Sequence, residues 1–237
     1  MIGLLVELAI SWLLLWFLYK TDLSVLGFYP TKNRVYDFIF GFFTIAIFCL
    51  LHFKTIAILT NHEFVINKNF TTIQFFKSAW WVLASVLYEE FLFRGALLYI
   101  LIKKLGINKA CIISGIAFGI YHWFSYGVVG NPVQMIFVFF TTAIWGVAFA
   151  YAYARTKSLY LPIGLHLGWN LINIVIFSKG PLGIQLLLNN NDKKLDGIVS
   201  LVFFLLPIVA LPIVTYFYLR KSKNTKSRNS EYSSEIE

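Results

Sequence analysis

The sequence predicts an all-α membrane protein, a polytopic bundle of about seven transmembrane helices, or eight. Of the 237 residues, 59% are hydrophobic and only 13% are charged, whereas soluble domains average about 45–50% and about 25%. The mean hydropathy is +0.73. The apolar residues also gather in runs of roughly 20, which is the length that a helix needs to cross a bilayer.

Seven apolar runs are expected to form the spans. In chain order they cover residues 2–19, 38–59, 75–102, 110–126, 133–154, 159–177 and 198–219. The first has neither a basic leading region nor a small-residue cleavage site, so we interpret it as a retained helix and not as a signal peptide. Glu7 lies near its start and can reach the lipid headgroups. Pro162 falls in the first turn of the sixth span, where proline is tolerated.

The basic residues alternate between the two sides of this map. Loops on one side hold thirteen Lys or Arg residues and loops on the other side hold four. Such a bias places the basic loops in the cytoplasm, with the N-terminus outside and the C-terminus cytoplasmic. The net charge of +9 therefore reports orientation, and we expect no nucleic-acid partner. Residues 220–237 are rich in Lys, Ser and Glu and are expected to be a disordered cytoplasmic tail.

Three charged residues interrupt the third span, namely Glu89, Glu90 and Arg94. On insertion scales each such group costs about 2.5–3.5 kcal/mol at a helix centre. A membrane helix tolerates them only where they face the bundle interior and meet polar partners. Glu90 and Arg94 are four residues apart, so they are expected to form an intrahelical ion pair. Glu89 points about 100° away and is left for another partner.

Two other spans offer such partners at a similar depth. Counting about 1.5 Å per residue from the nearest basic loop, Glu89, His122 and Asn170 all lie roughly 20 Å from the cytoplasmic edge, with His166 and Arg94 roughly 14 Å from it. His166 and Asn170 are four residues apart and share one helix face. The sequence therefore predicts one polar layer in the bundle interior, built from three helices.

This set of groups suits the hydrolysis of an acyl bond. A carboxylate screened from water can act as a general base, and a nearby imidazole can hold water against it. Neutral His and Asn side chains can donate hydrogen bonds to a developing oxyanion. Ser85, Ser114 and Ser125 lack a base at a convincing spacing, so no serine nucleophile is expected.

Small residues indicate how the helices pack. Gly115–x–x–x–Gly119 could let another helix approach closely, and Gly164–x–x–x–Gly168 is typical of packing. Cys49 and Cys111 both lie in apolar runs and are interpreted as buried free thiols, neither a disulfide nor a zinc site.

Three motifs carry a resemblance to a known family. Glu89–Glu90–x–x–x–Arg94, Phe118–x–x–x–His122 and His166–x–x–x–Asn170 stand in the order and spacing of the CPBP family, the CAAX proteases and bacteriocin-processing enzymes. The resemblance covers residues 80–173, under half of the chain. It implies an intramembrane endopeptidase, with residues 1–219 as a transmembrane peptidase domain.

The resemblance also implies a role for each residue. Glu89 would activate water with help from His122, and His166 with Asn170 would form the oxyanion site. Glu90 and Arg94 would hold the helix and tune Glu89. No metal is expected. The family has also been interpreted as metalloproteases, and two His with one Glu could bind Zn²⁺, although the chain has no His–Glu–x–x–His helix.

Other interpretations stay open. The substrate would be a membrane-associated peptide or protein, prenylated at a CAAX-type end or otherwise lipidated, or a bacteriocin or signalling peptide, and the setting a prokaryotic cell membrane. The alternative is a non-proteolytic immunity or scaffold protein in which a Glu90–Arg94 pair fixes helix register and His166 and Asn170 only join helices. A transporter is a weaker alternative, because the chain shows no paired repeats.

Overall fold

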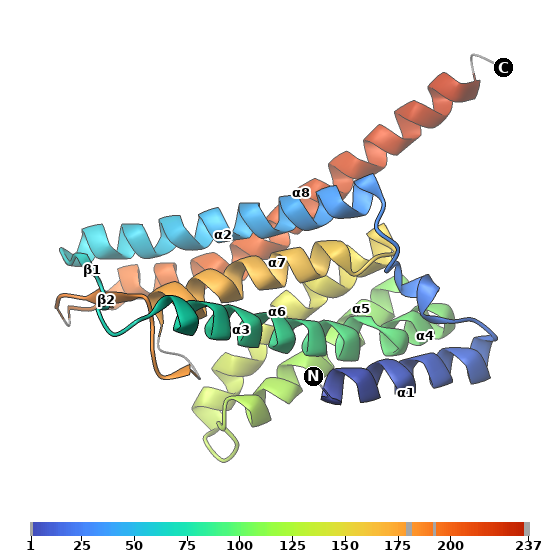
Figure 1. Cartoon of the computed structure of the whole chain (residues 1–237). Helices are drawn as coiled ribbons and strands as arrows, with labels where there is room; N and C mark the ends of the chain where they lie inside the picture. Colours follow the sequence, from blue (N-terminus) through green and yellow to red (C-terminus); the bar gives the residue numbers. More distant parts are fainter. Residues whose placement is uncertain (1, 179–181, 192, 235–237) are drawn as a thin grey trace.

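The computed structural model describes residues 2–178, 182–191 and 193–234 as a bundle of helices with a small sheet at one end (Figure 1). The α-helices are α1 Ile2–Tyr19, α2 Lys32–Thr60, α3 Thr72–Arg94, α4 Ala96–Leu105, α5 Ile107–Ser125, α6 Pro132–Thr156, α7 Tyr160–Asn170 and α8 Gly197–Ser234. The predicted all-α membrane bundle is confirmed.

Four short elements complete the part of the fold that the structure describes. A 3₁₀ turn, η1 Leu23–Leu26, follows α1, and a π-helix, η2 Leu171–Phe177, continues α7. Strands β1 Phe64–Ile66 and β2 Leu187–Asn189 form an antiparallel pair with Val65 opposite Leu188. This pair ties the end of α2 to the segment after η2, so it closes the end of the bundle at the left of Figure 1.

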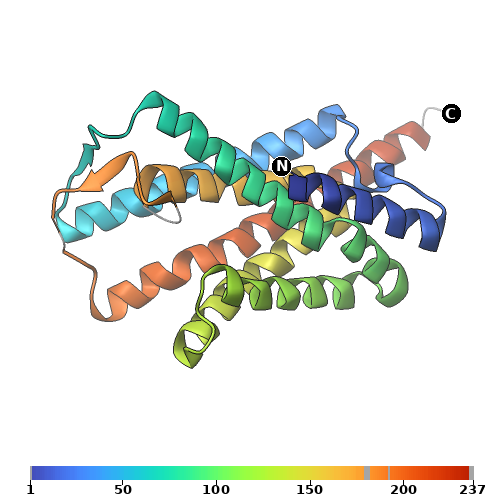
Figure 2. The same cartoon turned by 60° about the horizontal axis from the view of Figure 1, so that its bottom comes forward.

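Among the described residues, five helical stretches are long and apolar enough to cross a membrane. They are Ile2–Tyr19, Lys32–Thr60, Pro132–Thr156, Tyr160–Phe177 and Gly197–Lys221. The two remaining expected spans correspond to α3 and α5, which run alongside the others in the bundle (Figure 2) but carry the polar residues of the predicted layer. The chain is an integral membrane protein; a total of seven crossings stays a prediction.

The prediction of one continuous span over residues 75–102 is wrong. The helix stops at Arg94 and restarts at Ala96, because Gly95 leaves the helical region of backbone space with ψ at −135°. A Cβ atom at this position would lie 2.2 Å from the carbonyl oxygen of Phe91, so only glycine fits the break. Helix α4 then packs against α5, and the depth of Glu89 cannot be counted along a straight helix from Lys103.

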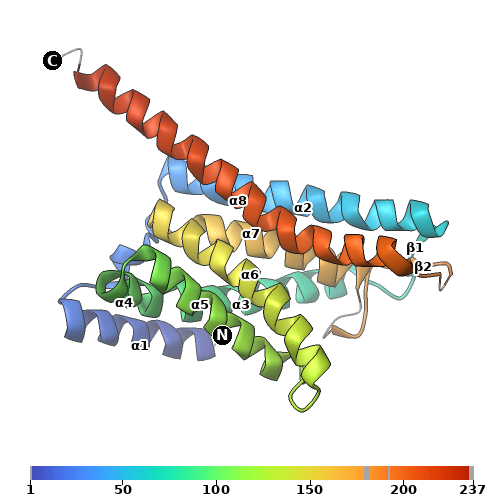
Figure 3. The same ribbon diagram turned by 180° about the vertical axis from the view of Figure 1, so that it is seen from behind.

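The disorder expected for residues 220–237 stays a prediction, and the helix before them continues beyond its apolar part. Helix α8 runs to Ser234, and its last turns project away from the bundle (Figure 3). Pro207 and Pro212 lie within α8, and no proline or glycine follows Pro212 to end the helix, so the backbone hydrogen bonds continue past the apolar part.

Two helix pairs pack closely through glycines, as expected. A Cβ atom at Gly164 or Gly168 would lie 2.4 Å from the carbonyl oxygen of Phe38 or Phe42, so α7 lies directly against α2. In α5, a Cβ atom at Gly115 would lie 2.4 Å from the side chain of Val147 on α6. These contacts hold α7 and α5, which carry the histidines of the predicted layer, close to their neighbours.

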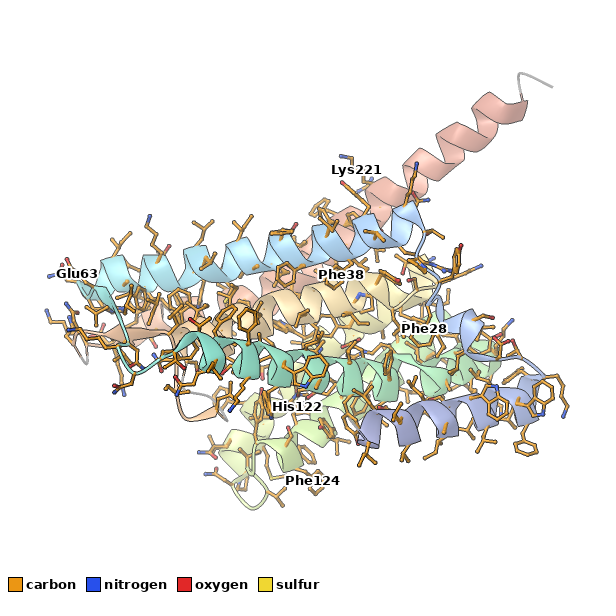
Figure 4. All side chains as sticks on the ribbon, in the orientation of Figure 1. Phe28, Phe38, Glu63, His122, Phe124 and Lys221 are labelled. Atoms are coloured by element: carbon orange, nitrogen blue, oxygen red, sulfur yellow. The ribbon has the colours of Figure 1, made fainter. Side chains whose placement is uncertain are left out.

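The two ends of the bundle differ in charge. The turns that follow α1, α4 and α6 lie at the end to the right in Figure 1, and Lys221 lies toward the same end while Glu63 marks the other (Figure 4). Those turns carry most of the loop lysines and arginines. The loops that are rich in Lys and Arg in the sequence therefore lie together at one end of the bundle, and the other end is less basic. His122 lies between them, at mid-length of the bundle (Figure 4).

Candidate active site

Helix α3 brings its three charged side chains into the bundle interior. Glu90 and Arg94 are fully buried, and Glu89 retains 8% exposure. Nη1 of Arg94 donates to Oε1 of Glu90 at 3.2 Å, which confirms the predicted pair four residues apart. Removed from water, this pair is stable only if its remaining groups also find partners.

Part of the Arg94 guanidinium finds partners on two other helices, whereas its Nε and Oε2 of Glu90 have no hydrogen-bond partner among the described residues. Its Nη2 donates to the carbonyl oxygen of Gly146 on α6 at 3.2 Å, and its guanidinium carbon lies 4.2 Å from the ring centre of Phe118 on α5. A Cβ atom at Gly146 would crowd Phe118 at 3.0 Å, so glycine allows α6 to approach this closely. Arg94 therefore joins α3, α5 and α6 at the last turn of α3. The helix dipole also stabilises a cation at this end of the helix.

His166 on α7 is held by the other member of the pair. Its Nδ1 lies 2.8 Å from Oε1 of Glu90, so the carboxylate bridges Arg94 and His166. The imidazole also stacks on Phe149 of α6, with ring centres 5.0 Å apart and planes 19° from parallel. Because both the ring plane and Nδ1 are fixed, Nε2 is aimed in one direction.

His122 on α5 is fixed in the same manner by its own helix. Its Nδ1 lies 2.7 Å from the carbonyl oxygen of Phe118, one turn earlier, and a carbonyl oxygen can only accept. The ring of Phe118 packs edge-on against the imidazole with centres 4.4 Å apart. The phenylalanine of the second motif thus supports Arg94 and His122 together.

Glu89 lies where the two imidazoles converge. Its Oε2 is 3.8 Å from Nε2 of His122 and 3.7 Å from Nε2 of His166. Both distances exceed a direct hydrogen bond and suit contact through one water molecule. Among the described residues this oxygen has no hydrogen-bond partner, so the carboxylate is free to act on a bound molecule.

The partners of the two Nδ1 atoms also assign the hydrogens. Since Nδ1 of His122 donates to a carbonyl and Nδ1 of His166 donates to a carboxylate, each neutral ring carries its hydrogen on Nδ1. Each Nε2 then presents a lone pair toward Glu89. The convergence point therefore consists of three acceptors, which suits a ligand that donates, such as water.

Asn170 ends α7 one turn after His166, and the chain continues directly into the π-helix η2. Its side chain is half-buried and makes no hydrogen bond with any residue that the structure describes. The amide therefore shares the helix face of His166 but is not held by the other site residues. Single π-turns of this kind are frequent at functional sites.

Metal ions in proteins are held by His, Cys, Asp and Glu side chains. Among residues 2–178, 182–191 and 193–234, no group of three or more His, Cys, Asp or Glu side chains is arranged to hold a metal ion. Glu89, His122 and His166 would be the nearest candidates, since each histidine donates Nδ1 to an oxygen as metal-bound histidines do. A metal-free site stays a prediction.

Tertiary contacts add residues that no sequence motif indicated. Gly146 and Phe149 of α6 hold Arg94 and His166, although α6 carries no charged or histidine residue near them. Conversely, the hydroxyl of Ser114 donates to the carbonyl of Phe93, and Cys49 and Cys111 are buried free thiols, as predicted. None of these three side chains joins the convergence point around Glu89.

The predicted depth of Glu89 does not hold for a broken helix. The estimate for Glu89 assumed a straight helix to Lys103, and the break at Gly95 invalidates that count. Glu89, His122 and His166 nevertheless meet, because α3, α5 and α7 pack in one bundle with these residues buried. The need to bury charged groups determines which face of each helix points into the bundle. A depth counted along the chain, by contrast, fails wherever the helix is broken.

The fold and site together define an integral membrane helix bundle with a glutamate and two histidines converging in its interior. Residues 71–172 match the family model described as Type II CAAX prenyl endopeptidase Rce1-like. This segment contains all the residues of the three motifs, and the match supports the resemblance to the CPBP/CAAX protease family. No curated protein and no solved structure matches the chain.

Proposed function

We propose that the protein is an intramembrane endopeptidase that hydrolyses a membrane-proximal peptide bond with water activated by Glu89. The observation that carries the proposal is the convergence of Oε2 of Glu89 with Nε2 of His122 and of His166 at 3.8 and 3.7 Å. Membership of the matched segment in a family of CAAX-type proteases supports the same reaction class.

In the proposed first step, water donates one hydrogen bond to Oε2 of Glu89 and the other to Nε2 of His122. Both groups accept, so the water oxygen is left with lone pairs that face away from them and toward a substrate carbonyl. Glu89 removes a proton as the water oxygen bonds to the carbonyl carbon. The carbonyl oxygen becomes an oxyanion.

In the second step, the carbon–nitrogen bond breaks and the proton held by Glu89 passes to the leaving amine nitrogen. The products are a carboxylic acid and an amine, and Glu89 returns to its ionised form. General acid–base catalysis by one positioned group contributes about 10²- to 10⁴-fold. The barrier also falls because the reacting groups are positioned before the step begins.

The oxyanion would be stabilised from α7. The Asn170 amide is the neutral donor, since it has no partner within the described part of the chain. His166 would donate from Nε2 only when that nitrogen also carries a hydrogen. Glu90 and Arg94 act as positioning residues, since they hold His166 and do not themselves reach the convergence point.

The substrate would be a lipidated or membrane-embedded peptide, either a prenylated CAAX-type protein or a bacteriocin or signalling peptide. The protein would lie in a prokaryotic cell membrane with its N-terminus outside and its basic end in the cytoplasm, following the alternation of loop charges. No metal would take part. These assignments rest on the family description and on the sequence.

The test is cleavage of membrane-tethered peptides, prenylated and not, by purified protein in lipid. Wild type is compared with Glu89→Gln, which keeps the shape of the side chain and removes the base. Glu63→Gln is the matched control, since Glu63 is exposed at the far end of the bundle (Figure 4). We expect cleavage to fall at least about 100-fold in Glu89→Gln alone.

A chelator separates the remaining mechanisms. Activity that survives chelation and requires Glu89 supports the water-activating glutamate. Activity lost on chelation and restored by Zn²⁺ assigns the reaction to a metal held by Glu89, His122 and His166. If neither wild type nor Glu89→Gln cleaves any peptide although both fold equally well, the immunity or scaffold alternative is favoured.

A further inference from the structure

A second carboxylate lies in the membrane beside this site and takes no part in the proposed mechanism. Both carboxylate oxygens of Glu7 on α1 are buried, and neither has a hydrogen-bond partner among the described residues. The expectation that Glu7 reaches the lipid headgroups is therefore wrong. An unpartnered carboxylate away from water is costly, which makes Glu7 a candidate functional residue.

Glu7 lies on the face of α1 that packs into the bundle. Leu4, Ser11 and Leu15 are buried, and together with Glu7 they recur every three or four residues along that face. Helix α1 packs against α3, the helix of Glu89. The side chain of Glu7 is thus directed at protein and not at lipid.

The position of Glu7 along the bundle agrees with that of the site. A Cβ atom at Gly3 would lie 4.0 Å from the ring of Tyr88, which precedes Glu89. Since α1 and α3 run in the same direction (Figure 1), Glu7 follows about one turn later, and helical side chains lean back toward the N-terminus. Counted from the basic end, Glu7 is 13 residues from Lys20 and His122 is 13 residues from Lys109, roughly 20 Å in each case.

Tyr121 on α5 lies beside the site. Its ring packs edge-on against His122 with centres 5.3 Å apart. Helix α1, which carries Glu7, packs against α3, which carries Glu89. A peptide held at Glu89 and extending toward α1 would have the residues next to its scissile bond near Glu7.

The charges around the site indicate what Glu7 would bind. Glu90 is balanced by Arg94 and His166, and Glu89 faces two imidazoles. Glu7 has no cation of its own among the described residues, so a cationic group that enters the site would relieve its burial. A basic side chain is the peptide group that supplies both a positive charge and hydrogen-bond donors.

We propose that Glu7 is a substrate-binding residue that selects peptides with a lysine or arginine side chain near the scissile bond. The proposal rests on the proposed peptidase function only for the identity of the ligand as a peptide. It predicts a difference in binding affinity between peptides, which can be measured without cleavage.

Binding is measured with Glu89→Gln protein in nanodiscs of zwitterionic lipid, so that no peptide is cleaved. The probes are fluorescent membrane-anchored peptides that carry lysine or norleucine at each of several successive positions. We expect the lysine peptide to bind at least about tenfold more tightly at one position, a difference of about 1.4 kcal/mol. Adding Glu7→Gln should bring the ratio of the two dissociation constants close to 1.

Two variants keep the result interpretable. Glu7→Asp retains the charge and should retain most of the preference, whereas Glu63→Gln removes an exposed carboxylate and should leave the ratio unchanged. A ratio compares two peptides on one protein sample, so a partly unfolded sample does not alter it. Peptides with free and acetylated amino ends show whether the bound cation is a side chain or an α-amine.

Each result decides the proposal. A ratio near 1 at every position, or a preference that survives Glu7→Gln, overturns it, and so does a preference that requires the free amino end. Cleavage of the same peptides by protein with Glu89 intact is scored separately. Cleavage without the lysine preference leaves the peptidase proposal standing and removes this one; a Glu7-dependent preference without cleavage does the reverse.

Discussion

Replacing Arg94 by methionine should unfold this protein at a markedly lower temperature. The guanidinium is fully buried, donates to Glu90 and to the carbonyl of Gly146, and lies over the ring of Phe118. Methionine fills a similar volume but leaves the Glu90 carboxylate with His166 as its remaining partner. The variant therefore removes one member of a buried pair, which is the costly way to alter it.

The magnitude follows from the burial. Breaking a buried ion pair by removing one partner costs about 3–5 kcal/mol. In a chain of this size each kcal/mol lowers the melting temperature by about 2–4 °C, so we expect a decrease of roughly 6–20 °C. Adding Glu90→Gln should restore much of the loss, because the uncompensated charge disappears while the Gln oxygen still accepts from Nδ1 of His166.

The assay is thermal unfolding of purified protein in detergent, compared at one scan rate because membrane proteins often unfold irreversibly. Arg155→Met is the matched control, since Arg155 is exposed at the end of α6. A melting temperature for Arg94→Met equal to that of the control would refute the reasoning. So would a double variant that loses as much as the two single variants together.

Three further outcomes are expected. Gly95→Ala should lower stability by about 1–3 kcal/mol, because the added methyl group would meet the carbonyl of Phe91 at 2.2 Å; a melting temperature unchanged from wild type would contradict the break between α3 and α4. Gly168→Ala should cost a similar about 1–3 kcal/mol by forcing α7 away from Phe42 on α2, measured in the same assay, and a neutral result would contradict that close contact. His122→Gln should reduce peptide cleavage roughly 100-fold with the melting temperature little changed, and retained cleavage would remove His122 from the proposed mechanism.

The sequence was most informative where one physical constraint acted on one segment. The first span was predicted at Ile2–Tyr19 and is found there, because apolar length alone determines a membrane helix. The Glu90–Arg94 pair was predicted from helical spacing and is confirmed, because partners four residues apart share a face in any α-helix. The resemblance to the CPBP family was drawn from the three motifs, and the family model that matches residues 71–172 supports it.

Three features of the structure were not predicted from the sequence. The break at Gly95 lies inside an uninterrupted apolar run, so neither hydropathy nor periodicity marks it, and an isolated glycine is common within membrane helices. The strands β1 and β2 are three residues each and are separated by about half of the chain, so no local pattern distinguishes them from loops. Glu7 was assigned to the headgroups because its distance from α3 cannot be read along the chain.

The sequence by itself determined the class of protein, most of its apolar helices and the residues that had to be buried together, because the bilayer penalises every charge that lacks a polar partner. Only the tertiary structure decided which partner each group takes. Glu90 contacts both Arg94 and His166. Glu89 faces the Nε2 atoms of His122 and His166, and both carboxylate oxygens of Glu7 are buried. Those choices depend on distances of a few ångströms between side chains on different helices, which the close packing of α3, α5, α6 and α7 establishes.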